Sequence, residues 1–160
     1  MFAYDRRGRG DSGDTPPYVV QREIEDLAAL VHEAGGSASV FGYSSGANLA
    51  LRAAADRLPI TRLALYDAPY IVDVEQARSQ PDHAAHLAEL IGAGQRGDAV
   101  EYFQTRLVGI PEEIVVQMRH APFRPALEAI AHTLVYEAIV TGDRSLPTEL
   151  AGAVNDAHPG

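Results

Sequence analysis

Residues 38–46, Ala-Ser-Val-Phe-Gly-Tyr-Ser-Ser-Gly, are the starting point for the architecture of this chain. The segment 38–41 is short, partly β-branched and followed by glycine, which indicates a buried strand. Residues 46–58 are rich in alanine and end before Pro59, which indicates a helix able to pack closely on a sheet. The segment 42–46 must therefore turn a strand directly into a helix.

The turn at 42–46 matches the pattern G-x-S-x-G. Such a turn holds the serine, here Ser44, in a strained backbone conformation with its hydroxyl exposed. Gly42 and Gly46 are expected to prevent collisions across the turn, with Tyr43 as a supporting neighbour. The backbone N–H of Ser45 would point at a developing oxyanion. The pattern predicts Ser44 as a nucleophile, and the alternative is a glycine-rich turn with an idle serine.

The segments on either side of this unit extend the same pattern. Residues 62–66 read as a further strand, and 2–4 read as the tail of another. Between them, 6–17 is a loop dense in Gly, Asp, Ser and Pro, and 20–31 shows helical apolar spacing that ends at two glycines. Strands that alternate with helices in this way predict a parallel sheet with right-handed crossovers.

The pattern changes after Pro69, because residues 72–142 contain no strand signal and several helical ones. The expected helices cover residues 82–91, 98–107, 111–120 and 122–141. A helical block inserted after a β-α-β-α-β run is interpreted as a cap over an active site. The expected divisions are a core with the turn at 1–70, a helical cap at 71–142 and a C-terminal tail at 143–160.

Two further stretches resemble a known family. Residues 5–12, Asp-Arg-Arg-Gly-Arg-Gly-Asp-Ser, are similar to the D-x-R-G-x-G-x-S loop that follows the fourth strand of many α/β hydrolases. Residues 65–69, Leu-Tyr-Asp-Ala-Pro, resemble the end of the sixth strand of that fold. The resemblance covers about residues 1–142 and is strongest over 1–70. It implies an α/β fold, with a partial α/β-hydrolase core of parallel strands and crossover helices followed by an α-helical cap. It also implies Ser44 as nucleophile, the Ser45 N–H as an oxyanion donor and the 5–12 loop as support near the site.

The chain departs from the family pattern at both ends, and the expectation is a sequence truncated there. In the family, an HG-type loop before the Asp-Arg-Gly loop donates a second oxyanion N–H, and only four residues precede Asp5. The strand that lies between the family's fourth and fifth strands is also missing. Residues 2–4 are therefore expected either to pair with 38–41 or to face them across a gap. Exposed sheet edges predict self-association.

A serine nucleophile needs a base, normally histidine, held by a carboxylate. His158 is the candidate base, since it alone among the histidines has a loop-like C-terminal context. His32 is interpreted as a surface residue of the 20–31 helix. His83 and His86 share a helix face at i, i+3 spacing, which could chelate a metal, although no further ligand pattern accompanies them. The remaining two, His120 and His132, are attributed to packing of the helical block.

Asp67 is the candidate catalytic acid. In some branches that the chain resembles, such as the haloalkane dehalogenase-like enzymes, the acid follows the sixth strand, which is where Asp67 stands. The alternative is an aspartate that caps the strand end or the entry to the helical block. In most of the family, however, the acid and the histidine follow two later strands, so the sequence does not assemble a complete triad.

Composition excludes several other classes. The formal net charge of −9 argues against nucleic acid and anionic membranes as partners. The absence of cysteine excludes disulfides and thiolate metal sites, and neither a cofactor nor a metal is expected. No stretch approaches the ~20 apolar residues of a membrane span, and the first residues lack a signal-peptide pattern. All 13 basic residues are arginine, which suggests a GC-rich bacterial source, and a cytoplasmic location is expected.

The sequence is compatible with two functions. The first is a serine hydrolase that acts on an ester-like small molecule through a Ser44 acyl-enzyme and is impaired in this chain. The alternative is a catalytically inactive fragment, or a binding or interaction module, derived from the same family. Whether a histidine comes within reach of Ser44 distinguishes the two.

Overall fold

The strand, turn and helix expected around Ser44 are present in the computed structural model, which describes residues 1–145. Strand β1 covers Ala38–Tyr43 and helix α2 covers Ser45–Ala55, so Ser44 alone separates them. The chain forms two compact units. The first contains residues 1–4, 17–80 and 140–145, and the second contains residues 5–16 and 81–139.

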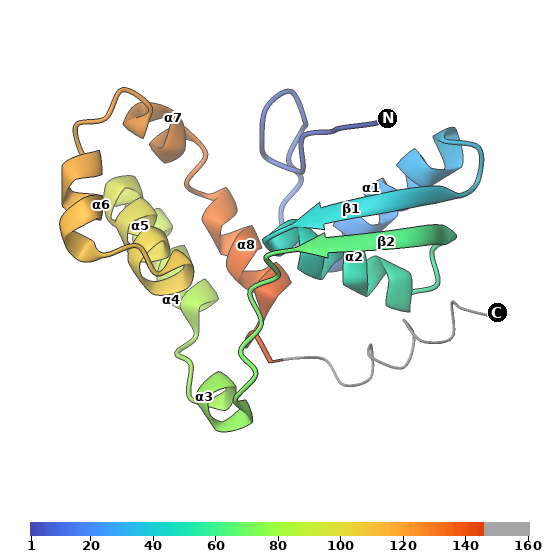
Figure 1. Ribbon diagram of the computed structural model, residues 1–160. Helices are drawn as coiled ribbons and strands as arrows, with labels where there is room; N and C mark the ends of the chain where they lie inside the picture. The colour runs from blue at the N-terminus through green and yellow to red at the C-terminus, as the bar shows by residue number, and fades with distance from the viewer. Residues whose placement is uncertain (146–160) are drawn as a thin grey trace. The chain divides into compact units, whose positions relative to one another are not determined.

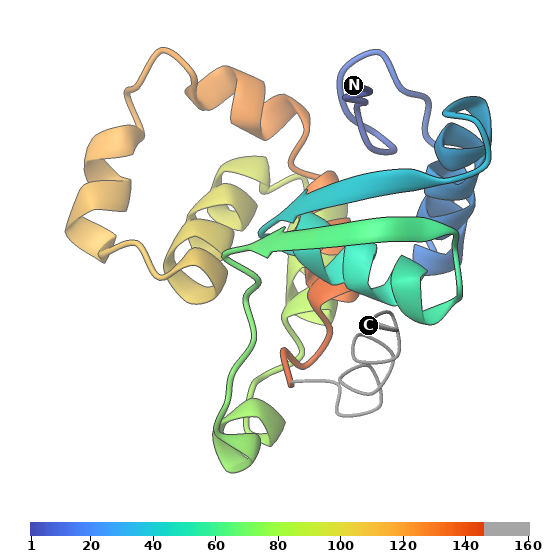
Figure 2. The ribbon, with the colours of Figure 1, turned by 45° about the vertical axis from the view of Figure 1, so that its right-hand side comes forward.

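The first unit is built on a parallel pair of strands. Strand β2 covers Ile60–Tyr66 and pairs with β1 so that Tyr43 lies opposite Tyr66 at the carboxyl ends. Helix α1 covers Val20–Glu33, and α1 and α2 lie on the same side of the two strands (Figures 1 and 2). This right-handed β-α-β arrangement, β1-α2-β2, is the crossover that the sequence predicted.

The core of the first unit lies between α1 and α2. It is a cluster of five buried apolar residues: Ile24, Leu27, Leu49, Ala53 and Val140. Two of these, Ile24 and Leu27, continue the spacing seen in the sequence, and the buried positions of α1 are Glu23, Ile24, Leu27 and Val31. Ala53 has no exposed surface, because a small residue lets the helices approach closely.

The prediction of a strand at residues 2–4 is wrong. These residues have no ladder partner, and the Phe2 side chain is 63% exposed. They line a pocket of about 760 Å³ whose other walls include residues 38–41 of β1 and residues of α1. The second expected arrangement, a gap between residues 2–4 and β1, therefore matches the structure. An extended segment becomes a strand only when a neighbour takes up its backbone hydrogen bonds, and β1 bonds to β2 alone among the described residues.

Between residues 74 and 141 the described chain is helical, as expected, but the boundaries differ. The elements are α3 (Val74–Arg78), α4 (His83–Gly92), α5 (Arg96–Tyr102), the π-helix η1 (Phe103–Val108), α6 (Glu112–Met118), α7 (Arg124–Ala129) and α8 (Thr133–Thr141). The helix expected at 98–107 is thus a short α-helix continued by a π-helix. Helix α3 was not predicted.

The single helix expected over 122–141 is interrupted at residues 130–132. The hydroxyl of Thr133 donates to the carbonyl of Ile130 at 2.8 Å, so a side chain takes an acceptor that a continuous helix would use. Arg9, from the loop at 5–16, in turn donates to the Thr133 hydroxyl at 3.3 Å and pairs with Glu137. This prediction failed because contacts between distant residues, rather than local apolar spacing, set the boundary.

The second unit has its own core, in which α4, α5 and α8 meet. Leu87, Ala99 and Ala138 are its buried members. The loop at 5–16 packs on α8 within this unit, where the Tyr136 hydroxyl donates to Asp14 at 2.7 Å. Burial and this bond to Asp14 raise the pKa of Tyr136 to about 12, so its hydroxyl keeps its proton at neutral pH.

Candidate active site

Ser44 occupies the turn between β1 and α2 with φ 53° and ψ −125°. A positive φ is uncommon for a residue with a side chain and carries about 1–3 kcal/mol of strain. The backbone around it is held in place, since the Ser44 N–H donates to the Tyr66 carbonyl at 3.0 Å and the Ser44 carbonyl accepts from Ala47 at 2.8 Å. The sharp turn expected from the G-x-S-x-G pattern is therefore present.

The two glycines of the pattern have different surroundings. A Cβ added to Gly42 would lie 2.5 Å from the carbonyl oxygen of Gly46 and 2.6 Å from the Cα of Ala47. Both contacts are with backbone, which cannot rotate away as a side chain can. A Cβ added to Gly46 would meet no atom within 4 Å. Both glycines were expected to prevent collisions across the turn. Of the two, only Gly42 is in a place where a side chain would collide with described residues.

Asp67 is the neighbour of Ser44 at the carboxyl end of the sheet. The register places Tyr43, the last residue of β1, opposite Tyr66, the last residue of β2. Ser44 and Asp67 are the residues that directly follow these two strands. Asp67 is exposed and also has a positive φ, 54°. The carboxyl ends of parallel strands are where ligands bind in open α/β sheets. The candidate nucleophile and the candidate acid are therefore brought together, and both have strained backbones.

The two residues that precede this pair form an aromatic contact. The rings of Tyr43 and Tyr66 stack with centroids 5.7 Å apart and an interplanar angle of 23°. Tyr43 is 58% exposed and Tyr66 is 63% exposed. The stacked rings support the ends of both strands next to Ser44 and Asp67.

Ser45 is the first residue of α2, so its backbone N–H belongs to the amino-terminal turn of the helix. N–H groups of this turn project beyond the helix end, where the helix dipole favours negative charge. This is the position expected for an oxyanion donor.

Among the described histidines of the first unit, His32 stands in the last turn of α1 and is exposed. The helix leads into the amino end of β1, whereas Ser44 follows the carboxyl end, about 20 Å away for six residues at about 3.3 Å each. His32 is therefore not within reach of Ser44. The candidate base, His158, lies outside the described residues.

The other four histidines belong to the second unit. His83 is buried and its Nδ1 lies 2.8 Å from the Tyr102 hydroxyl, while the His86 ring packs on Tyr102 at 4.4 Å. His132 lies 3.6 Å from Asp14. His120 is exposed after α6. Within residues 1–145, no group of three or more potential ligand side chains surrounds a metal position.

A row of three polar side chains in the first unit was not predicted from the sequence. Asn48 and Arg52 of α2 and Asp56, the C-cap residue of that helix, follow one another at four-residue spacing and line a pocket. Helical spacing was the available signal, but the alanine-rich segment indicated only close packing against the sheet.

Comparisons with known proteins agree with this geometry. Residues 1–158 match the sequence family described as "Alpha/beta hydrolase family". The chain is also similar to the crystal structure of an alpha/beta hydrolase from Sphaerobacter thermophilus DSM 20745, with 58% sequence identity and a TM-score of 0.81. The chain belongs to the α/β-hydrolase family.

The similarity covers 92% of this chain and 57% of the Sphaerobacter hydrolase, so the chain spans little more than half the length of that structure. The search of curated proteins found no match. No helix within residues 1–145 is both long and apolar enough to cross a membrane.

Proposed function

We propose that the chain is a serine hydrolase that acts on an ester-like small molecule, with Ser44 as its nucleophile. The observation that supports this most strongly is the strained Ser44 backbone at a strand-to-helix turn within an α/β-hydrolase fold. The Ser44 oxygen attacks the substrate carbonyl and its proton passes to a base. The alcohol then leaves with a proton, and water releases the acid from the acyl-enzyme.

The developing negative charge on the substrate oxygen would be stabilised by the Ser45 N–H at the start of α2. Asp67 would serve as the acid that orients the base, a role supported by its place beside Ser44 at the strand ends. His158 would serve as the base. The helical block at 71–142 would act as the cap that selects the substrate.

We propose further that activity is impaired in this chain. The described histidine in the unit that contains Ser44 is at the opposite end of β1, and a single oxyanion donor, the Ser45 N–H, is proposed among the described residues. Loss of one such donor lowers the rate by about 10²–10³-fold. Turnover of an activated ester should therefore be slow and should depend on Ser44.

Covalent labelling tests this function without requiring efficient turnover. The full chain is treated with a fluorophosphonate, and the modified residue is located by mass spectrometry. We expect phosphonylation of Ser44, none in Ser44→Ala, and unchanged labelling in Ser37→Ala, which alters an exposed serine before β1. A folded chain whose Ser44 stays unmodified would instead favour an inactive fragment or a binding module.

Self-association through sheet edges also remains a prediction. Strands β1 and β2 each have one paired side among the described residues, which leaves an edge on both. Sedimentation velocity over a range of concentrations should reveal dimers or larger species. A monomer at every concentration, with a sharp and reversible thermal transition, would contradict this expectation.

A further inference from the structure

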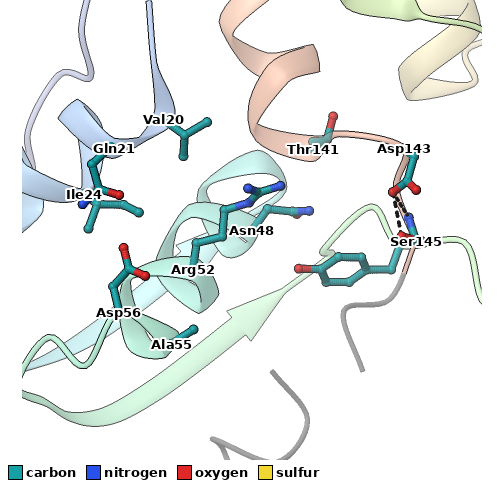
Figure 3. Close-up of a pocket in the computed structure, with 11 residues that line it drawn as sticks. Val20, Gln21, Ile24, Asn48, Arg52, Ala55, Asp56, Thr141, Asp143 and Ser145 are labelled. Carbon is teal, nitrogen blue, oxygen red and sulfur yellow. Dashed lines mark hydrogen bonds between the residues drawn. The ribbon is translucent and has the colours of Figure 1, made fainter. Parts of the chain in front are cut away.

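A second site lies along the flank of α2, in the first unit (Figure 3). It is a pocket of about 360 Å³, within the size range of small-ligand sites. Its walls come from the start of α1, from α2, and from residues 70 and 141–145. Residues 42–46 of the proposed catalytic turn do not line it, so the pocket is separate from that site.

Three polar side chains, two from α2 and one from its C-cap residue Asp56, line this pocket in a row, in the order amide, cation, carboxylate. Successive members of this row, Asn48, Arg52 and Asp56, are four residues apart, which places them on one helix face at intervals of about 6 Å. Figure 3 shows Arg52 between the other two. Although this spacing suits an ion pair, none joins Arg52 and Asp56 within residues 1–145. Hydrogen bonds from Ser145 lower the pKa of Asp143, and the Arg52 charge helps to lower it and also acts on Tyr70.

The Asn48 amide is a second polar group that could bind a ligand. Its side chain is 1% exposed, and its carbonyl oxygen makes no hydrogen bond in the part of the chain that the structure describes. Most buried amides have a partner, because burial without one is unfavourable. Rotation of the amide can present either its N–H₂ group or its oxygen to a ligand.

The charges of the lining define the ligand. Arg52 is the cation, and Asp56 and Asp143 are acids, so a simple anion would meet net negative charge. Asp143 is already engaged, since it accepts from the Ser145 N–H at 2.9 Å and from the Ser145 hydroxyl at 2.6 Å. Asp56 and Arg52 thus remain as an acceptor and a donor of opposite charge, about one helical turn apart.

The rest of the wall is mixed: Gln21, Tyr70, Thr141 and Ser145 are polar, and Val20, Ile24 and Ala55 are apolar. Val20 and Ile24 of α1 face Ala55 of α2 across the pocket. An aliphatic group could occupy this side and bury its surface there.

We propose that this pocket binds a small zwitterion of the aliphatic amino-acid class. The ligand carboxylate accepts from the Arg52 guanidinium and the Asn48 amide, and the ligand ammonium donates to the Asp56 carboxylate. The aliphatic side chain lies against Val20 and Ile24. No bond is made or broken in this step, so the site is a binding site and not a second catalytic centre.

Calorimetric titration of the full chain tests the proposal with three probes of similar shape. L-Leucine has both charges, 4-methylpentanoate lacks the ammonium and 3-methylbutylamine lacks the carboxylate. We expect L-leucine to bind at least about tenfold more tightly than either analogue. Failure of L-leucine to bind at millimolar concentration, or equal binding of either analogue, would overturn the proposal.

Two variants test which residues bind the carboxylate and the ammonium of the ligand. Arg52→Met, which keeps the side-chain stem, should weaken L-leucine binding by at least about tenfold. Arg62→Met, at an exposed position of β2 that does not line the pocket, is the matched control and should leave binding unchanged. Asp56→Asn should remove the preference for L-leucine over 4-methylpentanoate. Equal loss in the Arg52 and Arg62 variants, or an unchanged preference in Asp56→Asn, would show that the row on α2 does not bind the ligand.

Discussion

Replacing Gly42 with alanine should destabilise the protein by about 3 kcal/mol, at the upper end of the range for added atoms in a packed site. The new methyl group would lie 2.5 Å from the Gly46 carbonyl oxygen and 2.6 Å from the Ala47 Cα. Because both atoms belong to the backbone of the turn, β1 and α2 would have to move apart. The Ser44 conformation depends on that approach. Urea unfolding followed by circular dichroism measures the loss.

Gly46→Ala is the matched control, since it adds the same methyl group two residues beyond Ser44. The added Cβ meets nothing within 4 Å, and alanine favours the helical conformation more than glycine does. We expect unchanged or slightly increased stability. A similar loss in both variants would mean that glycine is needed for backbone conformation at this turn and not for the close approach at Gly42.

Replacing Arg124 with methionine should cost about 2–3 kcal/mol. The Arg124 side chain is 8% exposed and donates to the Gly97 carbonyl at 2.8 Å, to Glu101 at 3.1 Å and to Glu128 at 2.6 Å. Its removal leaves a carbonyl and two carboxylates of the second unit without their buried donor. Thermal and urea unfolding should both report the loss.

Arg119→Met provides the comparison, because Arg119 also binds Glu101, with contacts of 2.8 and 2.7 Å. The Arg119 hydrogen bond is the main cause of the lowered pKa of Glu101. Its side chain is nevertheless 52% exposed, and solvent screens exposed pairs. We therefore expect a much smaller loss than in Arg124→Met. Equal losses would mean that bond geometry, and not burial, determines the stability of this network.

Much of the first unit was predictable from local patterns. Apolar spacing located α1, and alanine content with a following proline located α2, to within three residues at each end. The G-x-S-x-G pattern predicted the turn at Ser44 because few sequences permit a strand to become a helix across one residue. These features depend on residues within one or two turns of each other, which a sequence displays directly.

The features that failed depend on distant partners. Residues 2–4 have the composition of a strand, but a strand requires a neighbour, and residue type does not supply one. The break between α7 and α8 depends on Arg9, more than 100 residues earlier in the chain. The pocket along α2 exists only because α1 and residues 141–145 meet that helix.

The candidate site also combines features that the local sequence predicts with features that only the tertiary structure reveals. Local sequence chemistry sufficed to predict the turn that holds Ser44, since glycine, serine and helix-start positions have characteristic conformational preferences. Three features emerged only from the tertiary structure. They are the proximity of Ser44 and Asp67, the different surroundings of Gly42 and Gly46, and the polar row of Asn48, Arg52 and Asp56 along a pocket. Each depends on which segments pack together and in which register, and those are set by the free energy of the whole fold rather than by any single stretch of the chain.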